Sequence, residues 1–430
     1  GWSLTPDWGY YSKPPMVAWF IWLSTHVFGV SEFSTKLPAP LLYLATAYII
    51  QLTTEKLSTP KAGIWAFAIF ILSPFVTLNS WFVTTDAPLI FFWSLTVLFF
   101  ILADQTDKTR YWLLAGIFGG LGLLSKYTMI LLPAAIFFMY LFTHQYHRLI
   151  KWKFWLTIVI ALLVFSPNVI WQALNGFPSF IHTAELANKP GWDGNPHEFI
   201  PGQLIVFGPV ALIVLITTLG KRFRNQYPTV WYCTWTPLFI FSLKSFQGEA
   251  FVNWAAFAYA SGAILSGIAI STMKSWIKIS HLALSILVAV TFYHYPIIQK
   301  TLNIVPSTTN TPYARIEGWR ELSQQVAAVA QQNPAAYVAS NSRMVNAYLS
   351  YYLPESIQKL RTLNPDNHIS NHYELFYLLK DEERPVIWLS ERELTQHPIN
   401  PVLPPPSLLT KLEQPVYSSN VRTLWVYTIE

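Results

Sequence analysis

The sequence predicts a mainly α-helical protein with many membrane-crossing helices, followed by a small α/β domain. Of its 430 residues, 53% are hydrophobic and only 12% are charged, whereas about 25% of the residues in a typical soluble domain are charged. Aromatic residues make up 16% of the chain, with 19 Trp and 22 Tyr, as expected for rings at membrane–water boundaries. From about residue 301 the composition becomes that of a soluble protein. We therefore expect a membrane domain over residues 1–300 and a soluble domain over 301–430.

The net charge of +6 does not indicate nucleic-acid binding, because lysines and arginines in a membrane protein mostly set its topology. We expect membrane lipids as partners and no nucleic acid. The single cysteine, Cys233, excludes an internal disulfide. The chain opens in an aromatic, polar loop without an initiator Met, so we expect an N-terminal helix to precede Gly1.

The first apolar run, residues 16–30, is short for a membrane span and suits a position along the interface. Ten further stretches are candidate spans, several of them shorter than the roughly 20 residues that usually cross a bilayer. They are 37–52, 62–80, 88–103, 111–125, 127–142, 154–171, 204–220, 229–243, 251–270 and 282–298.

Basic residues are distributed unevenly between the two sets of alternate loops. One set holds Lys56, Lys61, Lys108, Arg110, Arg148, Lys151, Lys153, Lys221, Arg222, Arg224, Lys274 and Lys278. The other set holds only Lys13, Lys36, Lys126, Lys189 and Lys244. The positive-inside rule makes the first set cytoplasmic. The loops around Lys13 and Asp86, the loop 175–202 and the C-terminal domain are therefore expected on the outer face.

The C-terminal region alternates helical and strand patterns. Hydrophobic periodicity predicts helices over 316–332 and 344–353, and strands over 336–340, 386–390 and 423–429. A Pro-rich connection covers 398–406. This alternation predicts a small α/β domain.

The stretch 9–15, Gly-Tyr-Tyr-Ser-Lys-Pro-Pro, precedes the first apolar run. Its two prolines remove backbone donors and push Lys13 towards an extended conformation. Lys13 thus sits on a rigid elbow at the membrane edge, with Tyr10 and Tyr11 as weaker candidates beside it. The simpler interpretation is a snorkelling lysine that anchors a helix end.

Asp86 and Lys126 are ionisable residues at the edges of apolar stretches, where an uncompensated charge costs several kcal/mol. Asp86 lies in Thr-Asp-Ala-Pro-Leu, where it fits either a helix N-cap or a substrate site. Lys126 interrupts about thirty apolar residues between Tyr111 and Phe142. It is either interfacial or presents a positive charge to a phosphate.

Two further polar stretches belong to the same predicted face. The first contains His182, Glu185, His197 and Glu198, which suit sugar hydroxyls or a metal ion, although their spacing matches no metal motif and a solvated loop is the alternative. The second begins at Lys244. Because all these groups share one side of the membrane, they suit an anionic, lipid-anchored substrate with a polar head.

The ordered motifs resemble a known family over residues 1–298. They are Gly-Tyr-Tyr-Ser-Lys-Pro-Pro-Met (9–16), Phe-Gly-Val-Ser-Glu-Phe-Ser-Thr-Lys-Leu-Pro (28–38), Thr-Asp-Ala-Pro-Leu (85–89) and Gly-Leu-Leu-Ser-Lys-Tyr (122–127). The chain is similar to the bacterial branch of the dolichyl-phosphate-mannose-protein mannosyltransferase-like (PMT-like) glycosyltransferases, which have the GT-C fold. That branch includes the lipid A aminoarabinose transferase.

The resemblance implies an inverting enzyme of the bacterial inner membrane that transfers a sugar from a polyprenyl-phosphate donor to a lipid or glycan acceptor at the periplasmic face. It assigns the donor phosphate to Lys13 and Lys126, and a catalytic role to Asp86. It places the general base in an Asp-Glu motif upstream of the Lys-Pro-Pro stretch, which we expect to precede Gly1. Asp7 is the alternative within the chain. The resemblance leaves a divalent metal cofactor, the sugar and the acceptor open.

Other functions share part of this pattern. A transporter or flippase of a lipid-linked saccharide has similar spans and outer cations, but more often shows internal repeats or paired broken helices, which the sequence lacks. A lipid-linked-sugar ligase of another fold uses the same substrate chemistry. A protein that only binds an envelope partner is the third alternative. The order of the motifs favours the PMT-like glycosyltransferase.

Overall fold

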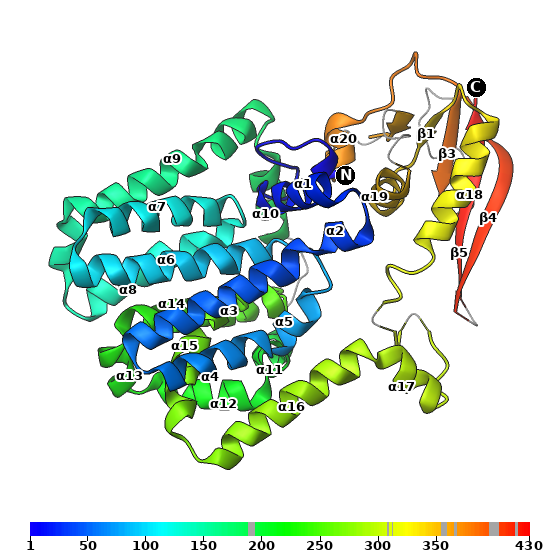
Figure 1. Cartoon of the computed structure of the whole chain (residues 1–430). Helices are drawn as coiled ribbons and strands as arrows, with labels where there is room; N and C mark the ends of the chain where they lie inside the picture. Colours follow the sequence, from blue (N-terminus) through cyan, green and yellow to red (C-terminus); the bar gives the residue numbers. More distant parts are fainter. Residues whose placement is uncertain are drawn as a thin grey trace. The chain divides into compact units, whose positions relative to one another are not determined.

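A computed structural model describes residues 1–430 except 188–193, 308, 312, 354–358, 365–367, 395–403 and 418–419. The chain forms two compact units: Trp2–His294 is the first, and Tyr295–Glu430 together with Gly1 is the second. The prediction of a mainly helical chain that ends in a small domain with a β-sheet is confirmed (Figure 1).

The first unit is helical throughout its described residues. Its α-helices are α1 (Met16–Phe28), α2 (Glu32–Lys36), α3 (Pro38–Leu57), α4 (Pro60–Ile71), α5 (Pro74–Asn79), α6 (Asp86–Thr106), α7 (Thr109–Leu123), α8 (Leu131–Phe142), α9 (Trp152–Leu174), α10 (Pro178–Ala187), α11 (Pro196–Phe207), α12 (Pro209–Ile216), α13 (Lys221–Gln226), α14 (Pro228–Gln247), α15 (Ala258–Thr272) and α16 (Ser275–Tyr293). Short 3-10 helices are η1 (Trp2–Leu4), η2 (Tyr127–Ile130), η3 (Tyr146–Ile150), η4 (Thr217–Leu219) and η5 (Val252–Ala255).

Among the described residues, four helical segments are long and apolar enough to cross a membrane: Glu32–Leu57, Asp86–Thr106, Trp152–Leu174 and Ser275–Tyr293. A fifth is possible if the bent pair Pro196–Phe207 and Pro209–Leu219 counts as one span. Shorter apolar helices cover several of the other expected stretches.

Several expected spans are broken, so their prediction as continuous helices is wrong. The stretch 251–270 is divided into η5 and α15, and 282–298 runs past the end of α16 at Tyr293. Two further breaks have a clear cause in the sequence. The stretch 204–220 bends by 106° between α11 and α12, because Gly208 adopts a φ of 93° and Pro209 then starts a new helix. The stretch 62–80 divides into α4 and α5, where the Ser73 side chain accepts a hydrogen bond from the Val76 N–H and begins α5. Hydropathy alone does not detect either break.

Small residues bring the helices that carry the site close together. Figure 1 shows α6, α7 and α9 side by side. A Cβ atom on Gly120 of α7 would lie 2.6 Å from the Cβ of Val164 on α9, and one on Gly116 would lie 2.7 Å from the Thr157 carbonyl oxygen. Glycines four residues apart therefore let the backbones of α7 and α9 approach each other.

The second unit contains α17 (Tyr295–Thr301), α18 (Trp319–Gln332), α19 (Arg343–Tyr352) and α20 (His372–Phe376). Its strands are β1 (Tyr337–Ala339), β2 (Leu360–Arg361), β3 (Val386–Ser390), β4 (Ser407–Tyr417) and β5 (Asn420–Ile429), in the order β2-β1-β3-β5-β4. The β1 strand pairs in parallel with β2 and β3, whereas β5 is antiparallel to β3 and β4. The expected helices and strands are present. The sequence did not predict β2, β4 or α20.

Candidate active site

The structure joins two of the predicted site residues directly. The Lys126 ammonium donates a hydrogen bond of 2.8 Å to Asp86 Oδ1, and the two side chains are 14% and 5% exposed. Asp86 is the first residue of α6, and Lys126 lies in the turn between α7 and η2. The N-cap interpretation of Asp86 is wrong, because Thr85 occupies that position and the Asp86 carboxylate pairs with Lys126.

Lys13 belongs to the same charged group. Burial and the neighbouring Lys126 ammonium lower the pKa of Lys13, and the Asp86 carboxylate opposes that shift in part. The elbow that carries Lys13 is tied to the Lys126 turn by a backbone hydrogen bond of 3.0 Å from the Met16 N–H to the Leu124 carbonyl. Two cations and one carboxylate therefore lie within electrostatic reach of one another at the start of α6, with one positive charge in excess.

A chain of buried polar side chains on α9 and α10 holds the elbow against the Lys126 turn. Ser179 Oγ donates to the Tyr10 carbonyl (2.7 Å), and Gln172 Nε2 donates to both Ser179 Oγ (2.8 Å) and the Tyr127 hydroxyl (3.1 Å). The Tyr127 hydroxyl in turn donates to Asn168 Oδ1 (3.2 Å). The network thus links the backbone just before Lys13 to the residue just after Lys126.

The sequence did not identify Asn168 and Gln172 as site residues, because they carry no charge. The signal that identifies them is two amides four residues apart on one face of the apolar helix α9, both fully buried. Buried amides in such a helix need hydrogen-bond partners. Asn168 Nδ2 finds a further one in the Trp8 carbonyl, at 2.7 Å.

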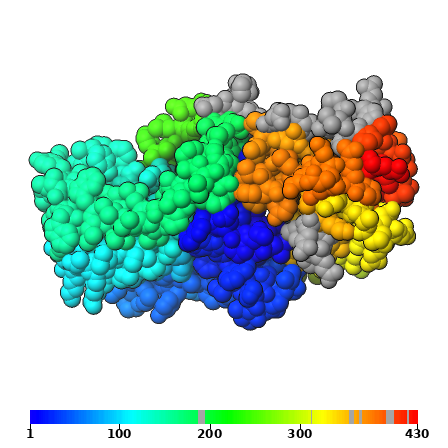
Figure 2. Space-filling model, turned by 90° about the horizontal axis from the view of Figure 1, so that it is seen from above, coloured from blue at the N-terminus to red at the C-terminus, as the bar shows by residue number. Residues whose placement is uncertain are grey.

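Tyr10 and Tyr11 are both buried, and both hydroxyls have partners within the protein. The Tyr10 hydroxyl donates to the Trp2 carbonyl at 2.9 Å, and its ring stacks on the Trp2 ring. The Tyr11 hydroxyl pairs with His182 Nδ1 of α10 at 3.2 Å. These contacts seat the N-terminal segment on α10, and Figure 2 shows the blue N-terminal segment beside the green segment that includes α10.

Asp7, the alternative base, has a carboxylate that is occupied by local donors. Its Oδ2 accepts from Trp171 Nε1 and its Oδ1 from the Trp8 N–H, each at 2.7 Å. Trp19 Nε1 donates to the Asp7 carbonyl at 2.9 Å. These bonds give Asp7 the role of an anchor for the N-terminal segment.

The remaining candidates lie around the start of α11 and the end of α14. His197 and Glu198 are in the first turn of α11, and Lys244 is in the last turn of α14. The two regions meet, because Asn195 Oδ1 accepts from the Ala250 N–H at 2.9 Å. Within the described part of the chain, neither His197, Glu198 nor Lys244 forms a hydrogen bond or ion pair with Asp86 or Lys126. Trp192 and Asp193 of the same loop, and Lys189, lie outside the described residues.

An apolar cavity of about 300 Å³ begins close to the Lys126 turn. Leu123, Met129 and Ile130 line it on either side of that turn, and it extends to Phe154 and Thr157 on α9. Its lining is almost entirely apolar, so it suits a hydrocarbon chain.

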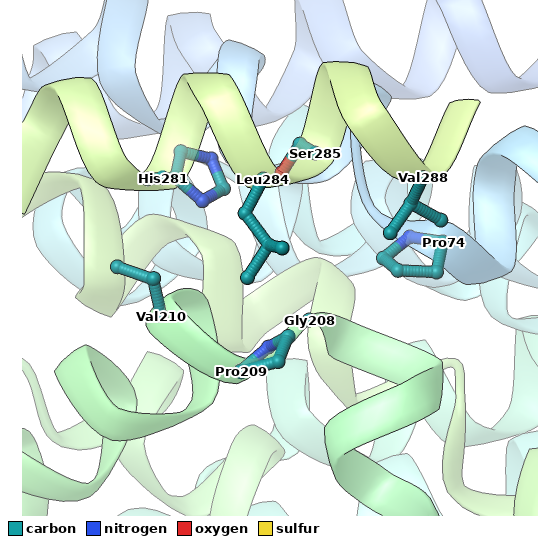
Figure 3. A pocket seen from close by; sticks show the side chains of 8 residues that line it. All are labelled: Pro74, Gly208, Pro209, Val210, His281, Leu284, Ser285 and Val288. Atoms are coloured by element: carbon teal, nitrogen blue, oxygen red, sulfur yellow. The ribbon is translucent and has the colours of Figure 1, made fainter. Parts of the chain in front are cut away.

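A second, much smaller cavity lies elsewhere in the first unit and contains none of the predicted residues. Figure 3 shows it between α16, the Gly208–Pro209 bend and Pro74. Its volume of about 10 Å³ is room for about one water molecule. His281 lines it and is 2% exposed. Among the described residues, no group of three or more His, Cys, Asp or Glu side chains is arranged to hold a metal ion.

Comparisons with known proteins show which proteins this chain resembles. Residues 12–171 match the model of the family described as dolichyl-phosphate-mannose-protein mannosyltransferase. The chain is 27% identical over 407 residues to the lipid A galacturonosyltransferase RgtD of Rhizobium johnstonii, a match that covers 92% of this chain and 85% of the relative.

The fold is similar to that of solved glycosyltransferases. Structures of ArnT from Cupriavidus metallidurans, in the apo state and bound to undecaprenyl phosphate, match with a TM-score of 0.66 and 14% identity, over 99% of this chain and 91% of theirs. The Archaeoglobus fulgidus oligosaccharyltransferase in the apo form matches with a TM-score of 0.51 and 12% identity, over 90% of this chain and 63% of the other. The resemblance indicated by the sequence motifs is confirmed.

Proposed function

We propose that this chain, a PMT-like bacterial glycosyltransferase of the GT-C fold, transfers a sugar from a polyprenyl-phosphate donor to a lipid or glycan acceptor of the cell envelope. The reaction takes place at the periplasmic face of the inner membrane, with inversion at the anomeric carbon. One observation carries the proposal. Lys13 and Lys126, from segments far apart in sequence, converge beside Asp86 at the end of an apolar helix.

The chemistry follows from the charges at this site. In the transfer step the bond between the anomeric carbon and the phosphate oxygen breaks, and the phosphate keeps the electron pair. The acceptor oxygen forms the new bond, and its proton passes to a general base. Cations placed where charge develops on the phosphate lower the barrier, and one or two such contacts commonly contribute about 2–4 kcal/mol. Lys13 and Lys126 supply those cations.

Asp86 acts through Lys126. In the structure its carboxylate holds the ammonium in one place at 2.8 Å. A donor phosphate competes with Asp86 for this ammonium, so the lysine is shared between the two anions when the donor binds. Asp86 thereby orients the cation before the donor arrives.

The rest of the donor fits the surroundings of the ion pair. The apolar cavity that begins at Leu123, Met129 and Ile130 suits the prenyl chain. The name of the relative RgtD favours lipid A or a related glycolipid as acceptor. His197, Glu198 and Lys244 are then candidates for contacts with the acceptor or the sugar.

The experiment combines donor binding with transfer. The full-length protein in membranes is incubated with radiolabelled sugar on polyprenyl phosphate, and Lys13→Ala and Lys126→Ala are compared with Lys36→Ala. Lys36 is a control because it pairs with exposed Glu32 instead of Asp86. We expect the two site variants to lose most of the transfer and the control to keep it. Movement of the lipid-linked sugar across the membrane without transfer would contradict the proposal and favour a transporter.

A further inference from the structure

Tyr43 is a buried polar side chain that is not among the residues proposed to bind the donor phosphate. It lies in the second turn of α3 and is fully buried. Its ring is held by Phe70 of α4 and Phe75 of α5, each with its centroid 6.4 Å away. The hydroxyl forms no well-aligned hydrogen bond with any described residue.

This hydroxyl lies near Asp86, the carboxylate member of the ion pair. The Thr84 side chain lies beside it, and the Asp86 carboxylate is within electrostatic reach. Thr84 Oγ1 also accepts a hydrogen bond of 3.3 Å from the Asp86 N–H. Tyr43 and Thr84 therefore lie next to the carboxylate as a second layer of polar groups.

A buried hydroxyl without a partner costs free energy in the folded state. Such a group in a native structure calls for an explanation, and a role in catalysis is one of them. In the structure Lys126 donates to the Asp86 carboxylate, so the carboxylate does not need the Tyr43 hydroxyl as a donor. When a donor phosphate draws the Lys126 ammonium towards itself, the carboxylate needs a replacement donor.

We propose that Tyr43 is a positioning residue that supplies this hydrogen bond to Asp86, directly or through Thr84, when Lys126 engages the donor phosphate. The inference rests on the proposed function, because it requires an anion that competes for Lys126. It assigns Tyr43 no contact with the substrate. In the free state the hydroxyl forms no well-aligned hydrogen bond with any described residue, so we expect its loss to affect the liganded state.

This difference between the two states separates a positioning role from a structural one. Removing an unpaired buried hydroxyl by Tyr43→Phe leaves the Tm of the free protein unchanged or raises it. The same change weakens binding of a polyprenyl phosphate about ten- to a hundredfold, the effect expected for one lost hydrogen bond to a charged group. A merely structural tyrosine would show the opposite pattern.

Tyr140→Phe is the matched control. Tyr140 is also a buried tyrosine of the helical unit, but its hydroxyl donates to Asp104 Oδ1 at 2.9 Å. Its removal leaves a carboxylate short of a donor, so we expect a lower Tm for the free protein. Undecaprenyl phosphate should bind to this variant as it binds to wild type.

The experiment measures the Tm of wild type, Tyr43→Phe and Tyr140→Phe in detergent, with and without undecaprenyl phosphate, together with sugar transfer. The expected result is a wild-type or higher Tm for free Tyr43→Phe, a smaller ligand-induced increase in Tm and weaker binding. If Tyr43→Phe binds undecaprenyl phosphate as tightly as wild type does, the role proposed for Tyr43 is wrong. Sugar transfer by wild type would still support the proposed function in that case. If wild type neither binds undecaprenyl phosphate nor transfers sugar, both fall.

Discussion

Lys126 and Asp86 are 40 positions apart in sequence and form an ion pair of 2.8 Å at the start of α6. The pair is almost completely enclosed, since only 5% of the Asp86 side chain is exposed. Lys13 adds a second cation on the neighbouring elbow. An enclosed carboxylate with two ammonium groups is costly to assemble. Its excess positive charge is the basis on which we propose that it binds the donor phosphate.

The two members of the pair should depend on each other for stability. Lys126→Met leaves a buried carboxylate without its cation, and we expect a loss of about 3–5 kcal/mol. Asp86→Asn keeps the side-chain shape and should cost less, about 1–3 kcal/mol. The double variant removes both charges and should be more stable than the sum of the single effects predicts. Thermal unfolding of the four proteins in detergent measures the coupling, and additive losses would show that the pair contributes nothing.

Donor binding should weaken at alkaline pH because of Lys13. Burial and Lys126 lower the pKa of Lys13, so this lysine loses its charge at a lower pH than an ordinary lysine, whose pKa is about 10.4. A phosphate binds the charged form, so affinity is full below the lowered pKa and falls as pH rises through it. Lys13→Arg should remove the part of the decline that Lys13 causes, because arginine stays charged. Titration of undecaprenyl phosphate against both proteins from neutral to alkaline pH checks this, and identical pH profiles would contradict it.

Gly9 should not tolerate a side chain. A Cβ atom at Gly9 would lie 2.3 Å from Cε3 of Trp171, the residue that donates to Asp7. Gly9→Ala must displace that ring, so we expect a loss of about 1–3 kcal/mol and a misplaced Lys13 elbow. Gly220→Ala is the control, because nothing lies within 4 Å of the position of its Cβ. Comparison of Tm and transfer rate for the two variants tests the prediction, and a harmless Gly9→Ala would refute it.

The second unit should lose stability in acid through Glu383. Hydrogen bonds from Arg361 lower the pKa of Glu383, and Arg361 Nε donates to Glu383 Oε2 at 2.6 Å. Because the pKa of Glu383 is lower in the folded protein, its ion pair with Arg361 stabilises the unit fully above the pKa of an ordinary glutamate, about 4.3. That stabilisation is lost as the pH falls through the lower pKa of Glu383 in the folded state. Glu383→Gln should cost about 1–2 kcal/mol at neutral pH and flatten this acid dependence. Glu413→Gln, in the half-exposed pair with Lys411, is the control and should change stability little.

The soluble unit was predicted well where the amphipathic pattern is strong. The helices α18 and α19 and the strand β3 fall within a few residues of their expected ranges. The strand β4 was missed because most of its residues are exposed or only partly buried, so no clear alternation marks it. The two-residue strand β2 is too short to leave a periodic signal.

In the helical unit, hydropathy located the apolar stretches but not their breaks at Gly208 and Ser73. A single glycine with positive φ ends a helix without lowering the hydropathy of the segment. The convergence of Lys13, Asp86 and Lys126 was predictable because charges at the edges of apolar stretches are costly unless they meet a partner. The supporting amides Asn168 and Gln172 were not predicted, since their role depends on which helices pack against α9. Tyr43 was not predicted either, since its position next to Asp86 also depends on how the helices pack.

The most direct test of the account is sugar transfer from a radiolabelled polyprenyl-phosphate donor in membranes that contain the full-length protein. Wild type, Lys13→Ala and Asp86→Asn are compared at equal expression. We expect transfer by wild type and loss of most of it in both variants. Wild-type rates in both variants, or no transfer from any polyprenyl-phosphate sugar, would contradict the assignment of this site to donor chemistry.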